Sequence, residues 1–135
     1  LIEARTVCQQ LIDGGSIDFL DVSLWDSFKM PEDEDHQDRS LLEHFTSLNY
    51  KNVKLTVAGK IRNGQEVHGI LNAGVDFVSI GRSAILHHNF PQLVMGDPDF
   101  IPVDNPVSKE HLKKEGLGEA FIRYMSGWPD FVAHD

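Results

Sequence analysis

The sequence predicts an α/β fold that forms the C-terminal portion of a (βα)8 TIM barrel: strands 6–8 with their helices, followed by a helical C-terminal tail. Two observations predict it. Three short apolar strand patterns alternate with helical patterns along residues 1–95, which is the rhythm of parallel βα units joined by right-handed crossovers. The second and third strand patterns each end in a glycine, and phosphate sites in such barrels often follow the last two strands.

Local signals define the elements of the first 95 residues. In IDFLDVS at 17–23, Leu20 and Val22 face one side of a strand, whereas Phe19, Asp21 and Ser23 face the other. A capping box between Ser40 and Glu43 begins a helix. The expected elements are a helix at 2–12, strands at 17–23, 54–58 and 76–80, helices at 40–48 and 64–73, and short helical pieces at 84–88 and 91–94.

The chain is expected to have two parts. Residues 1–95 supply the C-terminal βα units, and residues 96–135 supply an irregular, proline-containing connection and a helical tail that packs on the barrel. The tail has helical patterns at 109–115 and 119–125. Three parallel strands leave long apolar edges, and the chain begins in a helical pattern without Met. We therefore expect a fragment of a longer protein. A doubly wound open sheet would complete the strands as well, but the glycines favour the barrel.

Composition excludes several classes of partner. The formal net charge is −9, with 21 acidic and 12 basic residues, so the chain lacks the basic surface that nucleic acids or anionic membranes require. No apolar run approaches the length of about 18 residues that a membrane span needs. Cys8 is the only cysteine, which excludes an intrachain disulfide and predicts a reducing cytoplasmic compartment. Cys8 lies on an apolar helix stripe and is expected to be a core residue.

The candidate site follows the second and third strands. Ala58, Gly59 and Lys60 end one strand, and Gly81 and Arg82 end the next. Backbone N–H groups approach an anion closely where no Cβ intervenes, and a guanidinium matches phosphate geometry. We therefore expect the N–H groups of both pairs, Gly59 with Lys60 and Gly81 with Arg82, to hold one phosphate. The alternative is that each glycine only relieves a tight turn.

Other residues give weaker signals. Asp21 and Ser23 are expected to be interior polar residues with a structural role, with catalysis as the alternative. Trp25 and Asp26 either line a ligand pocket or pack in the loop. The acidic run at 32–35 is interpreted as a solvated surface, since it lacks EF-hand spacing. None of the seven histidines has HExxH spacing, and no Ser-His-Asp or Cys-His arrangement stands out. No metal site is expected, and no catalytic residue can be assigned.

Three segments resemble a known family. DFLDVS, LTVAGKI and AGVDFVSIGRSAI are similar to the C-terminal strands of the Old Yellow Enzyme-like NADH:flavin oxidoreductases. The resemblance covers about residues 6–94, and its most specific part is the glycine after one strand paired with Gly-Arg after the next. Ala58 stands where glycine is common in the family, and Lys60 where an apolar or other polar residue is usual.

The resemblance implies an FMN-dependent oxidoreductase whose flavin phosphate sits on Gly59, Lys60, Gly81 and Arg82. NADH or NADPH would be the reductant, and a small-molecule electron acceptor, such as an activated alkene, would receive the hydride. Further expected partners are the N-terminal part of the same barrel and, as an open possibility, other copies of the chain. Two alternatives remain: another phosphate-binding TIM-barrel enzyme, either an isomerase or a lyase, and a non-catalytic half-barrel that acts as an interaction module.

Overall fold

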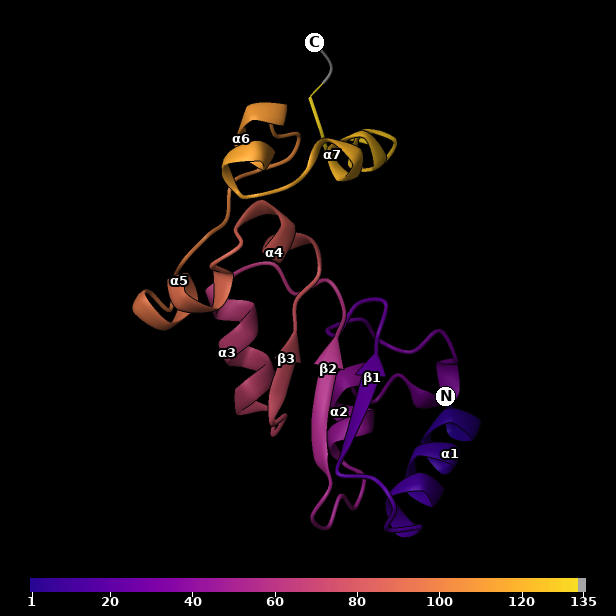
Figure 1. The fold of residues 1–135 in the computed structure, drawn as a ribbon. Coiled ribbons are helices and arrows are strands. Elements are labelled where there is room, and N and C mark those ends of the chain that lie inside the picture. The colour runs from indigo at the N-terminus through magenta and orange to yellow at the C-terminus, as the bar shows by residue number, and fades with distance from the viewer. Residues whose placement is uncertain (134–135) are drawn as a thin grey trace. The chain divides into compact units, whose positions relative to one another are not determined.

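The computed structural model describes residues 1–133 of the chain as an α/β structure (Figure 1), which confirms the predicted alternation of helices and strands. Its elements in chain order are α1 (Ile2–Asp13), β1 (Phe19–Ser23), the 3-10 helix η1 (Glu34–His36), α2 (Leu41–Thr46), β2 (Lys54–Ala58), α3 (Gly64–Asn72), β3 (Phe77–Ser79), α4 (Arg82–Leu86), α5 (Phe90–Gly96), α6 (Lys109–Lys114) and α7 (Glu119–Ser126). The predicted capping box is present: Ser40 Oγ accepts from the Glu43 N–H, and the Glu43 carboxylate accepts from the Ser40 N–H.

The three strands form one parallel sheet in the order β1-β2-β3. Val22 pairs with Val57, and Val57 pairs with Val78, so apolar side chains share one register across the sheet. The alternation predicted for β1 is confirmed, because Val22 is buried whereas Phe19 on the opposite face is 62% exposed. All three strands therefore direct their carboxyl ends toward the same edge of the sheet.

The prediction of a TIM-barrel portion is wrong. The described residues form an open three-stranded sheet whose outer strands, β1 and β3, each pair with only one neighbour. Barrel closure requires the first and last strands to pair with each other, with a consistent tilt and stagger around the ring. The glycines that favoured a barrel are also weaker signals than expected, because Gly59 has a packing cause of its own, described below.

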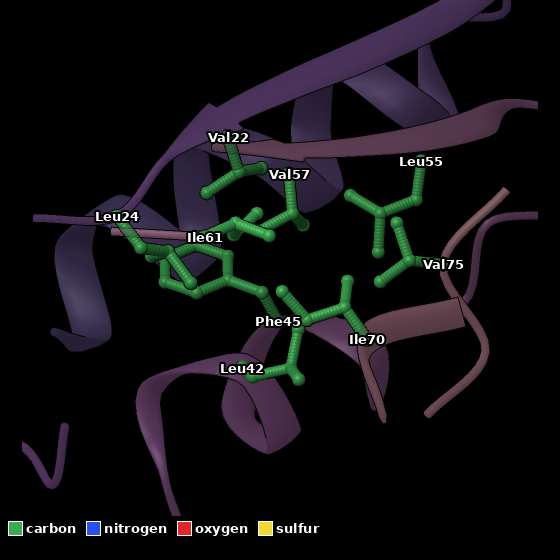
Figure 2. Packing of buried hydrophobic residues seen from close by; sticks show 9 residues of the cluster. All are labelled: Val22, Leu24, Leu42, Phe45, Leu55, Val57, Ile61, Ile70 and Val75. Carbon is green, nitrogen blue, oxygen red and sulfur yellow. The ribbon is translucent and has the colours of Figure 1, made fainter. Parts of the chain in front are cut away.

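A hydrophobic core lies between one face of the sheet and the helices that connect its strands (Figure 2). Figure 2 shows side chains from the sheet, from α2 and from α3 pointing toward one another. The nine buried residues are Val22, Leu24, Leu42, Phe45, Leu55, Val57, Ile61, Ile70 and Val75. Cys8 packs against this core as a partly buried residue, as predicted, and burial raises the pKa of its thiol. The thiol is therefore held in the protonated, less reactive form.

The chain forms two compact units. One contains residues 1–61 and 66–80, and the other contains residues 62–65 and those from 81 onward. The second unit has its own hydrophobic cluster, formed by Leu86, Val107, Leu112, Ile122, Met125, Phe131 and Val132. In this unit α6 is capped by Ser108, whose hydroxyl accepts from the His111 N–H at 3.1 Å. The predicted domain boundary between residues 95 and 96 stays a prediction.

Asp76 is expected to make the stability of the sheet depend on pH. Its carboxylate accepts hydrogen bonds from Lys54 Nζ at 2.7 Å and from the Leu55 backbone N–H at 2.9 Å. The Lys54 hydrogen bond, followed by that of Leu55, lowers the pKa of Asp76 below its ordinary value. Folding therefore favours the ionised form. The contribution of the ionised Asp76 carboxylate to stability is complete above the unfolded pKa of about 4. It is lost as pH falls through the lower folded pKa.

Urea unfolding of the wild type and of Asp76→Asn, at about pH 6 and about pH 3, measures this contribution. At the higher pH the wild type should have a higher urea midpoint than Asp76→Asn. At the lower pH the difference between the two midpoints should shrink. Lys54→Met keeps the Leu55 hydrogen bond and should retain part of the pH dependence. A difference between wild type and Asp76→Asn that stays constant with pH would contradict the assignment.

Candidate functional site

The turn after β2 is attached to the loop after β1. The Ala58 carbonyl accepts from the Leu24 N–H at 2.7 Å. The Gly59 carbonyl accepts from the Ser27 N–H at 3.1 Å and from the Ser27 hydroxyl at 3.0 Å. Ser27 is fully buried, so its hydroxyl needs this partner. These bonds fix the position of Ala58 and Gly59 at the carboxyl edge of the sheet.

Gly59 is required by packing within the chain. Its φ is 154°, a value that L side chains rarely adopt, and a Cβ at this position would collide with the Leu24 carbonyl oxygen. The same Cβ would lie 2.9 Å from the Ser27 hydroxyl. The close approach of the Leu24 backbone therefore explains the glycine without any ligand. A phosphate on the neighbouring N–H groups stays a prediction.

The Lys60 side chain is directed toward the loop after β1. Lys60 itself has a positive φ of 50°, and its ammonium lies 3.5 Å from the Asp26 carboxylate and 5.9 Å from the centroid of the Trp25 ring. A cation near an aromatic face is attracted by the ring quadrupole. The sequence prediction used only the backbone of Lys60 and missed this cluster. The available signal was the position of Trp25 and Asp26 directly after a strand.

A pocket of about 680 Å³ opens beside this cluster. Its wall is mostly apolar and includes the Trp25 ring, which is 80% exposed, together with Met30, Pro31 and Leu41. Lys29, which also lines the pocket, forms an ion pair of 2.6 Å with Glu32. The volume is in the range of small-molecule sites, which are mainly apolar with few polar groups. Trp25 therefore lines a pocket, which is one of the two interpretations predicted for it, and the binding of a ligand there stays a prediction.

Gly81 and Arg82 follow β3, at the start of α4, and belong to the second compact unit. Both residues are exposed. A Cβ at Gly81 would meet no heavy atom within 4 Å, so packing within the described chain does not require a glycine here. The next residue, Ser83, is buried and its hydroxyl donates to the Arg62 carbonyl at 3.0 Å. Gly81 and Gly59 therefore differ, since a Cβ would collide with another part of the chain only at Gly59.

The structure brings Ala58, Gly59 and Lys60 together in one turn. This turn belongs to the first compact unit, whereas Gly81 and Arg82 belong to the second. A single phosphate cradle formed by the two pairs of residues stays a prediction. Asp21 and Ser23 are exposed on the sheet face opposite the core, so the prediction of interior positions for these two residues is wrong. The acidic residues at 32–35 are exposed, as predicted for a solvated surface, and Asp33 caps η1.

Among residues 1–133, no group of three or more His, Cys, Asp and Glu side chains is arranged to hold a metal ion. Across the same residues, no helix combines the length and the apolar character needed to cross a membrane.

Comparisons with known proteins identify no family for this chain. No protein-family model, no curated protein and no solved structure matches the chain. Any functional assignment therefore depends on the residues of this chain and on the chemistry that they allow.

Proposed function

We propose that this chain supplies the flavin-phosphate-binding part of an FMN-dependent oxidoreductase, similar to the Old Yellow Enzyme-like NADH:flavin oxidoreductases. NADH or NADPH would serve as reductant and a small-molecule electron acceptor as oxidant. When bound, FMN would supply the hydride-transfer chemistry, and this chain would bind and orient its phosphate. A reducing cytoplasmic setting belongs to the same proposal, since Cys8 is the only cysteine.

The observation that carries the proposal is the open space at Gly81. Gly81 lies beside the exposed Arg82, and no heavy atom of the chain would contact a Cβ at Gly81. This open space is what we expect where the backbone must remain accessible to an anion. Arg82 would add charge-assisted hydrogen bonds to the phosphate. The pattern of the sequence assigns the Gly59 and Lys60 N–H groups to the same phosphate. The exposed Trp25 ring and the adjoining pocket fit a ligand with a planar ring system.

A comparison of FMN with riboflavin tests the phosphate assignment directly, because riboflavin lacks only the phosphate. Flavin fluorescence quenching should show tighter binding of FMN, and Gly81→Val should remove that preference by placing a side chain beside the anion. Arg82→Met should weaken FMN binding by about 10- to 100-fold, the value of a charge-assisted hydrogen bond, with little effect on riboflavin.

Gly118→Val is the matched control. Gly118 also directly precedes a helix, α7, and a Cβ there would likewise meet no heavy atom within 4 Å. This variant should retain the preference for FMN. Equal affinity of the wild type for FMN and riboflavin would overturn the proposal. Tight binding of inorganic phosphate without any flavin binding would instead favour a phosphate-dependent isomerase or lyase.

A second candidate, a non-catalytic interaction module, is favoured by one specific observation. The side chains of Phe121, Tyr124 and Trp128 form an exposed aromatic row on and after α7. Their rings are in contact, with centroid separations of 5.8 Å between Phe121 and Tyr124 and 6.1 Å between Tyr124 and Trp128. Exposed aromatic side chains are enriched in protein interfaces. Failure to bind any flavin, with an intact fold, would favour this candidate.

A further inference from the structure

The connection between α5 and α6 is attached to the end of α4 through the ring of His87, the C-cap residue of α4. The Val103 backbone N–H donates a hydrogen bond of 3.0 Å to His87 Nε2. The Phe100 ring packs edge to face on the same imidazole, with centroids 5.3 Å apart, and also contacts the Phe90 ring. One side chain thus holds two points of the connection, at residues 100 and 103.

The hydrogen bond from Val103 fixes the protonation state of His87. An imidazole nitrogen accepts a hydrogen bond only when it carries no proton, so Nε2 is unprotonated and the ring is neutral with its proton on Nδ1. A protonated imidazolium donates from both nitrogens and has no acceptor. Histidine is also the side chain whose charge ordinarily changes between pH 5 and 8. The contact between His87 and Val103 is therefore compatible with one charge state only.

We propose that His87 is a pH-sensitive latch, in which protonation of its ring breaks the hydrogen bond from Val103 and releases the part of the connection around Val103 from the end of α4. Phe100 would stay attached, because its carbonyl accepts from the Gly64 N–H at 2.9 Å and its N–H donates to the Asp97 carbonyl at 3.0 Å. Ile101 and Val103 are already exposed in that connection. The acid form would thus loosen the exposed apolar segment that follows Phe100.

The charged groups around His87 set the direction of the response. From α6, the His111 ring lies 5.7 Å away and its Nε2 donates to the Leu86 carbonyl at 2.8 Å. Glu115, the residue after α6, accepts from the His88 N–H at 2.9 Å and from His88 Nδ1 at 2.8 Å. In the connection, the Asp99 carboxylate accepts a hydrogen bond from the Gln65 side-chain amide at 3.1 Å. The Asp97 carboxylate accepts one from the Asp99 N–H at 3.0 Å.

These surroundings favour the neutral ring. Burial is the largest cause that lowers the pKa of His87; the Glu115 carboxylate opposes it, and His111 and His88 add to the lowering. Because the folded pKa lies below the ordinary value, the unfolded chain binds the proton first as pH falls. The contribution of the latch to stability is therefore complete above about pH 6.5 and is lost between that pH and the lower folded pKa.

Amide hydrogen exchange at Val103, expressed as a protection factor, tests the latch. Between about pH 7.5 and about pH 5, the protection of the wild-type amide should fall about five- to tenfold, the value of one net hydrogen bond. His87→Gln keeps a neutral acceptor, so its protection should not change with pH. His87→Phe keeps an aromatic ring without an acceptor, so its protection should be low at both pH values.

His88→Gln is the matched control, because it removes the neighbouring titratable ring and leaves the His87 hydrogen bond in place. It should respond to pH as the wild type does. An NMR titration of the His87 ring in the wild type should show its protonation over the same pH range as the loss of Val103 protection. Protection in the wild type that stays constant with pH, or a pH response that persists in His87→Gln, would overturn the proposal.

Discussion

Replacement of Gly59 with alanine is expected to lower the free energy of unfolding by about 3–5 kcal/mol. The added Cβ would collide with the Leu24 backbone carbonyl, a group that cannot move aside as a flexible side chain can. Relief of the collision would shift the turn and break the hydrogen bonds that Ser27 donates to Gly59. The estimate combines overpacking, backbone strain and the loss of partners for a buried hydroxyl.

Gly15→Ala separates strain from collision. Gly15 has a φ of 67°, so alanine there is strained, but a Cβ would meet no heavy atom within 4 Å. We expect a loss of only about 1–2 kcal/mol, the ordinary cost of a left-handed conformation in a residue with a Cβ. Urea unfolding followed by circular dichroism measures both variants. Similar losses for the two would show that the contact with Leu24 adds nothing to the conformational cost.

The contrast between Gly59 and Gly81 shows what a strand-ending glycine does not reveal in a sequence. Both residues follow apolar strands, and the sequence assigned them the same role. The structure gives Gly59 a steric cause in Leu24, which is far from it in the chain, and leaves Gly81 open. Local patterns carry no information about which backbone segment will approach a turn. The phosphate hypothesis therefore now depends more on Gly81 than on Gly59.

Local signals were sufficient for the α-helices and strands, but the 3-10 helix η1 was not predicted. The alternation in β1 and β2 and the capping box at Ser40 are short-range patterns, and the structure contains each of them. The same signals did not determine whether the strands close into a barrel or form an open sheet. The glycines and the strand rhythm led to a barrel, whereas the described chain forms an open sheet. The Lys60–Asp26 pair was missed for a related reason, since it joins two loops that only the parallel pairing of β1 and β2 brings together.

Helix α3 provides a test of burial at adjacent positions. Ile70 and Leu71 are adjacent apolar residues of this helix, but Ile70 is 0% exposed and Leu71 is 37% exposed. In Figure 2 the Ile70 side chain points into the core formed with Leu55 and Val75. Ile70→Ala should therefore lower the free energy of unfolding by about 2–5 kcal/mol, through lost burial and the cavity left behind.

Leu71→Ala is the control with the closest match, because it removes the same number of carbon atoms from the same turn of the same helix. The change should cost less than about 1 kcal/mol, since Leu71 is not part of the buried cluster and is 37% exposed, and alanine favours the helix slightly. Urea midpoints at constant slope measure both variants. If Leu71→Ala cost as much as Ile70→Ala, the side of α3 that carries Leu71 would be covered in solution. The placement of this helix against the sheet would then be wrong, because a helix that buries both positions equally must be rotated toward Leu71.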